Sequence, residues 1–129
     1  MRYLLLIYSD ETKTRTQEQT DQSIARHTQA IAEATRRGIL RGVAPLFPTS
    51  SATTVRQQRD GVFLVTDGPF AETKEQLGGY YILECDNLDE AIDFARRIPP
   101  CSGTGCIEIR PIQALPEPMA AAAAGQARA

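Results

Sequence analysis

A short run near the start of the chain constrains the fold most, because it has the pattern of a β-strand that is apolar on both sides. Successive side chains of a strand point to opposite faces of its sheet. The two sets here are Tyr3, Leu5 and Ile7 on one face and Leu4, Leu6 and Tyr8 on the other. Such a strand needs a cover on each face. The run is too short to cross a membrane or to form the core of a signal peptide.

Length and charge favour a single globular domain in the cytoplasm. The chain has 129 residues, which is a usual length for one domain. Its 14 basic and 16 acidic side chains leave a formal net charge of −2, which argues against nucleic acid as the main partner. The three cysteines, Cys85, Cys101 and Cys106, contain no C-x-x-C pair and are expected to be free thiols. We therefore expect no metal site, no cofactor and no membrane association.

Two helices are expected from their capping signals. Thr16 followed by Gln19 has the pattern of a capping box, and Gly38 lies where a helix beginning there would end. Asn87 followed by Glu90 predicts the start of a second helix in the same way. The inward stripe of the first helix is expected to consist of Ile24, His27, Ile31 and Ala34.

The strands complete a recognisable order of elements. Besides the first strand, we expect strands over 39–46, 77–85 and 106–112, with a hairpin inserted before the third of these four strands. The hairpin joins 53–56 to 62–66 through Asp60 and Gly61, a pair typical of a type I′ turn in which both residues have positive φ.

This order predicts an α+β, ferredoxin-like βαββαβ sandwich with an inserted β-hairpin. Its sheet is mostly antiparallel and both helices lie on one face. The domain covers residues 1–113, whereas residues 114–129 form an Ala- and Pro-rich tail without apolar periodicity, expected to be disordered.

Two helices on one face leave the other face of this sheet uncovered. The strand over 77–85 is apolar on both sides, as the first strand is. An exposed patch of this size is unusual on a monomer. We therefore expect a homodimer in which two sheets pack face to face. The alternative is a monomer whose hairpin folds over the open face.

Residues 65–81, VTDGPFAETKEQLGGYY, resemble the signature of the DGPF branch of the YCII-related family. The segments YLLLIYSDE at 3–11, ATTVR at 52–56 and NLDEA at 87–91 agree with it. The resemblance implies a dimeric α+β barrel, and it links many members to extracytoplasmic-function sigma factors. More distant relatives are linked to chloride elimination from products of aromatic ring cleavage. In that wider family a histidine on the first helix is a candidate catalytic group, and His27 fits its position.

His27 and Asp67 are the candidate catalytic residues. The pKa of a histidine lies near neutrality, so His27 could act as a general acid or base. Its alternative role is that of a core histidine bonded to a backbone carbonyl. Asp67 could orient His27 or contact the substrate, or it could hold the tight turn that it forms with Gly68 and Pro69. Phe70 is expected to plug the core. The Asp-Pro that the wider family carries near the end of its second helix is absent here.

Six further residues are candidates for ligand binding. Asp10 ends the first strand and could reach His27, whereas Arg41 and Lys74 could hold an anionic group. Tyr80 and Tyr81 point to opposite faces, so one is expected in the core and the other in a pocket. Glu72 belongs to a mixed charge run that is either a solvated surface or the rim of a cleft. Gly78 and Gly79 indicate a bulge or a close approach of strands.

Two functions remain open from the sequence. One is a cofactor-free lyase or isomerase for a small anionic or aromatic compound, in which His27 moves a proton. The other is a non-catalytic ligand-binding or regulatory protein that associates with a sigma factor. A cleft-forming fold favours the first only by analogy.

Overall fold

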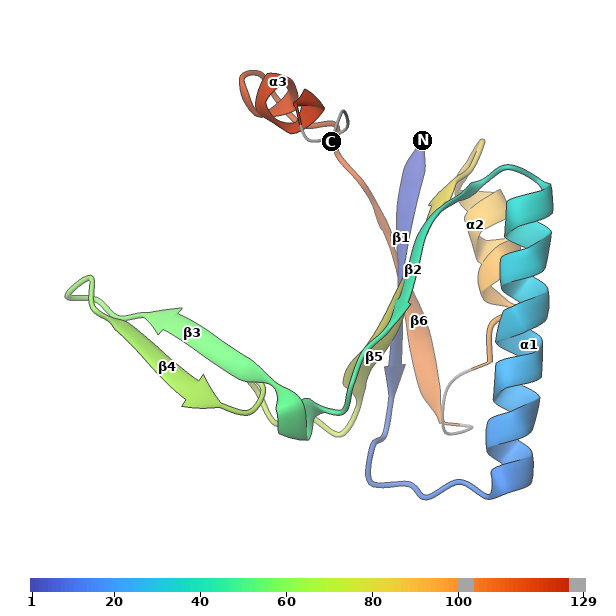
Figure 1. Cartoon of the computed structure of the whole chain (residues 1–129), viewed down its shortest axis with the longest axis horizontal. Helices are drawn as coiled ribbons and strands as arrows, with labels where there is room; N and C mark the ends of the chain where they lie inside the picture. The colour runs from blue at the N-terminus through green and yellow to red at the C-terminus, as the bar shows by residue number, and fades with distance from the viewer. Residues whose placement is uncertain (100–103, 126–129) are drawn as a thin grey trace.

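One antiparallel sheet and two helices form the body of the molecule. The computed structural model describes residues 1–99 and 104–125, so Cys101 lies outside the described residues. The sheet has the order β2-β5-β1-β6, and all three strand pairs are antiparallel. Its strands are β1 (Arg2–Ser9), β2 (Leu40–Pro45), β5 (Gln76–Glu84) and β6 (Gly105–Pro111). The helices α1 (Gln17–Arg36) and α2 (Leu88–Ala95) both lie on one face of it (Figure 1). The expected ferredoxin-like α+β fold is confirmed.

The core fills the layer between the sheet and the two helices. The inward side chains of β1 pair in register with those of β5, so that Leu5 lies opposite Tyr81 and Tyr3 opposite Leu83. All four are buried. The helices contribute Ala30 and Ala34 from α1 and Ala91 and Phe94 from α2.

Both ends of α1 form as their residues predict. The Thr16 hydroxyl accepts from the Gln19 N–H at 3.1 Å, and the Gln19 side chain accepts from the Thr16 N–H at 2.9 Å. Gly38 follows the helix with φ of +70°, a conformation that glycine adopts without strain. Of the predicted stripe, Ala34 is buried and His27 and Ile31 are half-buried, whereas Ile24 is 60% exposed.

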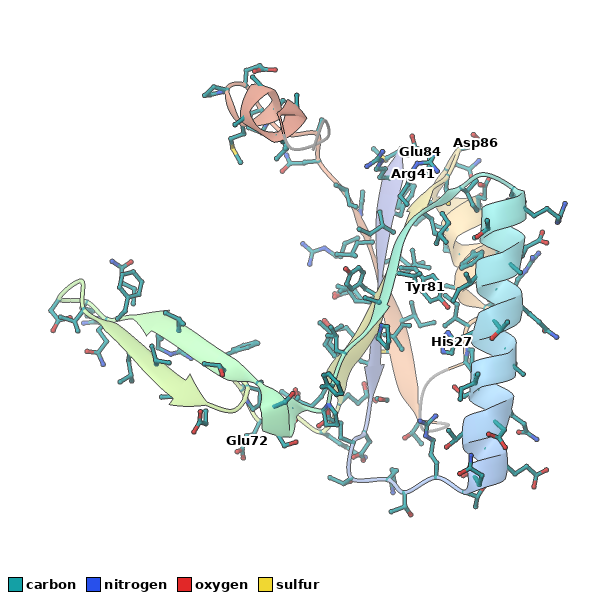
Figure 2. The ribbon with its side chains drawn as sticks, viewed as in Figure 1. His27, Arg41, Glu72, Tyr81, Glu84 and Asp86 are labelled. Atoms are coloured by element: carbon teal, nitrogen blue, oxygen red, sulfur yellow. The ribbon has the colours of Figure 1, made fainter. Side chains whose placement is uncertain are left out.

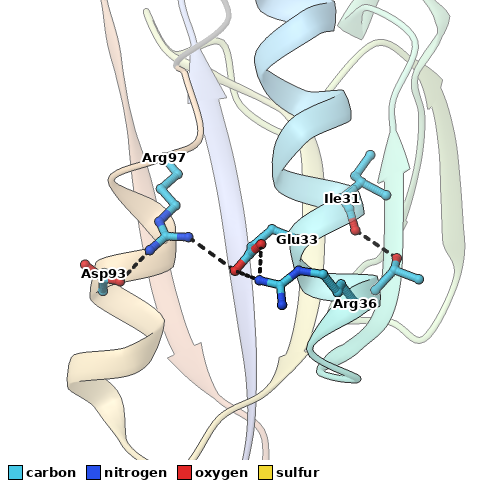
Figure 3. A network of polar contacts seen from close by, with 6 residues as sticks. Ile31, Glu33, Arg36, Asp93 and Arg97 are labelled. Atoms are coloured by element: carbon cyan, nitrogen blue, oxygen red, sulfur yellow. Dashed lines mark hydrogen bonds and ion pairs between the residues drawn. The ribbon is translucent and has the colours of Figure 1, made fainter.

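Polar contacts join the outer surfaces of the two helices (Figure 3). Arg97, just after α2, reaches Asp93 at 3.3 Å and Glu33 of α1 at 3.9 Å. Glu33 also pairs with Arg36 at 2.6 Å, and this hydrogen bond is the main reason that its pKa is lowered. Such solvated pairs contribute little to the free energy of unfolding, so the helices are held mainly by the core beneath them.

The inserted hairpin is a separate two-stranded sheet that projects away from the body (Figure 1). Its strands are β3 (Thr53–Gln57) and β4 (Phe63–Asp67), and a short 3-10 turn, η1 (Thr49–Ser51), precedes them. We call residues 53–67 the arm. The predicted type I′ turn is wrong, because Gly61 has φ of +85° whereas no other residue type in the described chain has a positive φ. Instead, the Gly61 N–H bonds the Gln58 carbonyl, and Gly61 takes the left-handed position that closes a longer loop.

None of the residues that the structure describes forms a layer over the face of the sheet opposite the helices. The outward side chains of β1 and β5 are largely apolar: Leu4, Leu6, Tyr8, Tyr80 and Ile82. We call this surface the open face. The alternative in which the hairpin folds back over it is wrong for the single chain, because the arm extends away from the sheet instead (Figure 1).

The tail after β6 is not entirely irregular, in contrast to our expectation. It contains a short helix, α3 (Met119–Ala124), which lies apart from the sheet in Figure 1. Alanine has the highest helix propensity, which accounts for helix formation without a packing partner. Within the described ranges, no helix has the length and apolar character to cross a membrane.

Candidate functional site

A cavity of about 320 Å³ lies between α1 and the β2–β5 side of the sheet. Its volume is near the lower end of the range for small-molecule sites. Most of its lining is apolar, with Ile31 from α1 and Val43 and Pro45 from β2 among the contributing residues. The polar side chains on the cavity side are those of Ser23, His27, Thr28 and Tyr81, whereas Tyr80 borders the cavity with its side chain on the opposite face of β5. No acidic side chain, lysine or arginine of the described chain lines it.

His27 and Tyr81 form the polar centre of this cavity. His27 projects from α1 toward the sheet, and Tyr81 projects from β5 toward the helix (Figure 2). The His27 Nδ1 atom lies 2.7 Å from the Tyr81 hydroxyl. The two rings are nearly parallel, with an angle of 12° between their planes. The contact therefore orients the imidazole and leaves Nε2 as the ring nitrogen that Tyr81 does not engage.

The surroundings of His27 favour its neutral form. Burial lowers its pKa below 6.5, and the positive charges of Arg26 and Arg15 lower it further. A neutral imidazole carries one N–H and one lone pair, whose positions depend on the tautomer. With the proton on Nδ1, His27 donates to Tyr81 and Nε2 can accept a proton. With the proton on Nε2, Tyr81 donates to Nδ1 and Nε2 is a donor.

Tyr81 is held more firmly than His27. It is 1% exposed and packs edge-on against Phe94 of α2, with 5.8 Å between the ring centroids. Its place on the inward face of β5 follows from the alternation of that strand, in which Leu83 is also buried. A buried ring fixed in this way provides a rigid anchor for the histidine.

The two glycines before the tyrosines shape the floor of the cavity. Between Ile7 and Tyr8 the register of β1 against β5 shifts, so that Gly78 is the extra residue of a bulge. A Cβ atom at Gly79 would lie 3.0 Å from the Ala44 carbonyl oxygen of β2. Both explanations expected from the sequence, a bulge and a close approach of strands, therefore apply, one to each glycine.

The acidic candidates belong to parts of the chain outside the cavity lining. Asp10 is buried after β1, where its carboxylate accepts from the Thr12 N–H at 2.9 Å, and hydrogen bonds from Thr12 lower its pKa. Asp67 ends β4 at the root of the arm, and Glu72 follows in the exposed segment before β5 (Figure 2). None of the three lines the cavity.

The two cationic candidates, Arg41 and Lys74, also lie outside the cavity lining. The Arg41 guanidinium bonds the backbone carbonyls of Gly38 and Leu40, at the far end of the sheet from the arm (Figure 2). Lys74 lies in a surface depression beside Tyr8 and Glu108. Of the eight residues singled out from the sequence, the cavity brings together His27, Tyr80 and Tyr81.

The tight turn after β4 is closed at Gly68 by hydrogen bonds to the start of β3. Gly68 has φ of +97°, its N–H bonds the Ala52 carbonyl, and its own carbonyl accepts from the Thr54 hydroxyl. These bonds close the root of the arm. The expectation that Phe70 plugs the core is wrong, because its ring is 79% exposed.

The described part of the chain contains neither a disulfide nor a cluster of metal-ligating side chains. Cys85 is buried and Cys106 exposed, and both are free thiols. No cluster of three or more metal-ligating side chains occurs among residues 1–99 and 104–125.

The lining residues that sequence reasoning missed are mainly those that shape the cavity. Ser23 and Ile31 of α1 and Val43 and Pro45 of β2 carry no chemical motif. Nor did the sequence identify Tyr81 as the partner of His27. The alternation of β5 places Tyr81 on one face with Leu83, but no local signal shows where along that face the helix crosses.

Comparisons with known proteins identify the family of this chain. A chain from Rhizobium meliloti (strain 1021), described as an uncharacterized protein, is 43% identical over 115 residues, which cover 87% of this chain and 92% of that protein. A solved structure of 5-chloro-2-hydroxyhydroquinone dehydrochlorinase from Burkholderia phenoliruptrix AC1100, in complex with 2,5-dihydroxybenzoquinone, matches with a TM-score of 0.46 and 15% identity. That match covers 88% of this chain and 94% of the other. The model of the YCII-related domain matches residues 1–116. The chain therefore belongs to the YCII-related domain family.

Proposed function

We propose that this protein binds a small, uncharged and largely apolar molecule in the cavity between α1 and β5, and that His27 transfers a proton to or from it. The observation that carries the proposal is the 2.7 Å contact between His27 Nδ1 and the Tyr81 hydroxyl within that cavity. A half-buried histidine whose ring is oriented by a fixed partner is suited to general acid–base work.

The lining argues for an uncharged ligand. Burying a carboxylate without a cationic partner costs several kcal/mol. Arg41 and Lys74, the cations considered for an anionic ligand, lie outside the cavity. Apolar walls with a few hydroxyls and one imidazole suit a ring that carries a hydroxyl or carbonyl group. Of the two ligand types considered from the sequence, we therefore favour the aromatic over the anionic.

The electrostatic surroundings of His27 favour its neutral form, which can accept a proton. Burial and two arginines disfavour the imidazolium, so His27 is neutral at pH 7. When Nδ1–H donates to Tyr81, the Nε2 lone pair can take a proton from a carbon or oxygen acid of the ligand. The resulting imidazolium returns the proton readily, because its surroundings destabilise it. This cycle is that of a cofactor-free isomerase or lyase.

The proposal includes a homodimer whose sheets meet at their open faces. Its support is the apolar character of Leu4, Leu6 and Ile82 on a face that neither α1 nor α2 covers. The regulatory alternative, association with a sigma factor, rests on the family resemblance. A sigma factor would bind an outer surface of this protein rather than the cavity.

The test uses the single histidine of the chain as its reporter. His27 ring resonances are followed by NMR while phenol or, as a charged probe of similar size, benzoate is added. We expect phenol to shift these resonances saturably and benzoate to leave them unchanged. Ile31→Trp, which fills the cavity from α1, should abolish the phenol response while leaving the far-UV circular dichroism unchanged. Equal responses to both probes, or none to phenol, would contradict the proposal.

A further inference from the structure

The arm exposes an apolar side that an isolated hairpin would not be expected to leave in water. Val55, Phe63 and Val65 are 62%, 61% and 63% exposed. Strand register places Val55 directly opposite Val65, and Phe63 lies two residues along β4 on the same side. A two-stranded hairpin without a packing partner is at best marginally stable in water. The exposed apolar side of the arm therefore needs a surface to pack against.

The arm and the open face border the same space. Figure 1 shows α1 and α2 on one side of the sheet and the arm extending from its lower end on the other side. That other side carries the outward residues Leu4, Leu6 and Ile82. The exposed rings of Phe47 and Phe70 flank the root of the arm. Any body that covers the open face is therefore adjacent to the arm.

We propose that the arm is a clasp, which packs its Val55–Phe63–Val65 side against a second copy of this chain bound at the open face. This inference rests on the homodimer proposed above and adds a second contact to it. In a two-fold dimer each copy presents one open face and one arm. Each sheet then covers the other, and each arm lies along its partner, so that both apolar surfaces of both copies are buried together.

The size of the combined surface supports a second copy as the occupant. The strands β1, β2, β5 and β6 have 8, 6, 9 and 7 residues, of which alternate ones face outward, and β3 and β4 have 5 each, of which alternate ones lie on the apolar side of the arm. The total approaches the roughly 20–30 residues per side of a stable protein interface. A second copy also matches the flat sheet in shape, since two sheets pack face to face about 10 Å apart.

The experiment compares two neighbouring arm residues that point to opposite sides. Val65→Lys places a charge on the apolar side, and Thr66→Lys places it on the other side of the same strand. Ile82→Lys tests the open face itself. Sedimentation equilibrium from about 1 to 100 µM gives the dimer dissociation constant of each variant. Circular dichroism confirms that each is folded.

We expect a wild-type mass of twice the 14.1 kDa chain. Val65→Lys should weaken the dimer at least about tenfold, as burying an unpaired charge in an apolar contact does, and Thr66→Lys should change it less than about twofold. A dimer weakened by Ile82→Lys but not by Val65→Lys would overturn the clasp and leave the homodimer standing. Equal weakening by both arm variants would also overturn it. A wild-type mass of one chain would overturn both the clasp and the homodimer. The arm would then bind a different protein, and the proposal for the cavity would be unaffected.

Discussion

The His27 imidazole and the Tyr81 hydroxyl meet at 2.7 Å although 54 positions separate the two residues along the chain. One comes from the middle of α1 and the other from the inward face of β5. Their contact turns a histidine that could have been an ordinary core residue into an oriented group at the wall of a cavity. The chemistry that we propose depends on this relationship, and the first three predictions test it.

Removing the Tyr81 hydroxyl should loosen His27 while leaving the fold intact. Tyr81→Phe keeps the ring that packs on Phe94. We expect unfolding to become easier by about 1 kcal/mol, the usual net value of one hydrogen bond. The ¹⁵N shifts of His27 should also change, because Nδ1 loses its hydrogen-bond partner. Urea unfolding and NMR measure the two effects. Tyr80→Phe removes the same atom from the opposite side of β5 and should leave the His27 shifts unaltered.

The stability of the protein should fall as the pH drops below about 6.5. The pKa of His27 is lowered from 6.5 in the folded chain, so the unfolded chain binds its proton more tightly. This stabilisation is complete above the unfolded value and is lost as the pH falls toward the folded pKa. Thermal unfolding between about pH 8 and pH 5 should show the loss in wild type and not in His27→Gln. Parallel curves for the two proteins would refute the lowered pKa.

Proton transfer can be tested without knowledge of the natural ligand. Cyclohexanone is uncharged and apolar, and its carbon-bound hydrogens beside the carbonyl exchange with D₂O when a base removes them. We expect the wild-type protein to accelerate this exchange at least about tenfold over buffer, well within the range of general base catalysis. His27→Gln should abolish the acceleration, whereas His27→Gln with added imidazole should recover part of it. An unaffected rate in His27→Gln would exclude His27 as the base.

The two glycines that shape the cavity floor should differ sharply in their tolerance of a methyl group. Gly79→Ala brings a Cβ to 3.0 Å from the Ala44 carbonyl oxygen, so the β2 backbone must shift by a few tenths of an ångström. We expect a loss of about 1–3 kcal/mol in the free energy of unfolding. In Gly78→Ala the nearest atom is Ser9 Oγ at 3.8 Å, an ordinary contact. That variant is the matched control, and a loss as large as that of Gly79→Ala would contradict our account of the bulge.

The capping box at the start of α1 should contribute measurably to stability. Thr16→Ala removes the acceptor for the Gln19 N–H and is expected to cost about 1 kcal/mol in chemical denaturation. Thr14→Ala, in the loop before the helix, should have no measurable effect. Because His27 lies well inside the helix, the NMR response to phenol should persist in both variants.

Local patterns predicted the elements well, because the forces that form them act within a few residues. The reciprocal bonds of Thr16 and Gln19 and the Asn87 cap of α2, which accepts from the Glu90 N–H at 2.9 Å, formed as expected. The hairpin formed too, but its turn differed, since Asp60 does not take the positive φ that a type I′ turn requires.

The site could be predicted only in part. His27 and the two tyrosines were recognised as candidates, yet so were Arg41, Asp67 and Lys74, which lie outside the cavity. Charged residues are candidates in any sequence because each can bind an ion or transfer a proton. Whether they meet depends on strand order and on the direction in which the arm projects, and neither is encoded by nearby residues.

The sequence by itself determined the strands, the helices and an apolar character on both sides of β1, because side-chain alternation and capping are local properties. Only the tertiary structure decided that the arm leaves the body, that β5 lies between β1 and β2, and that Tyr81 comes under His27. These outcomes depend on how whole surfaces pack against one another. Because β1 is apolar on both sides, its sheet needs a covering layer on each face. The fold shows that the face opposite α1 and α2 is the one left to be covered.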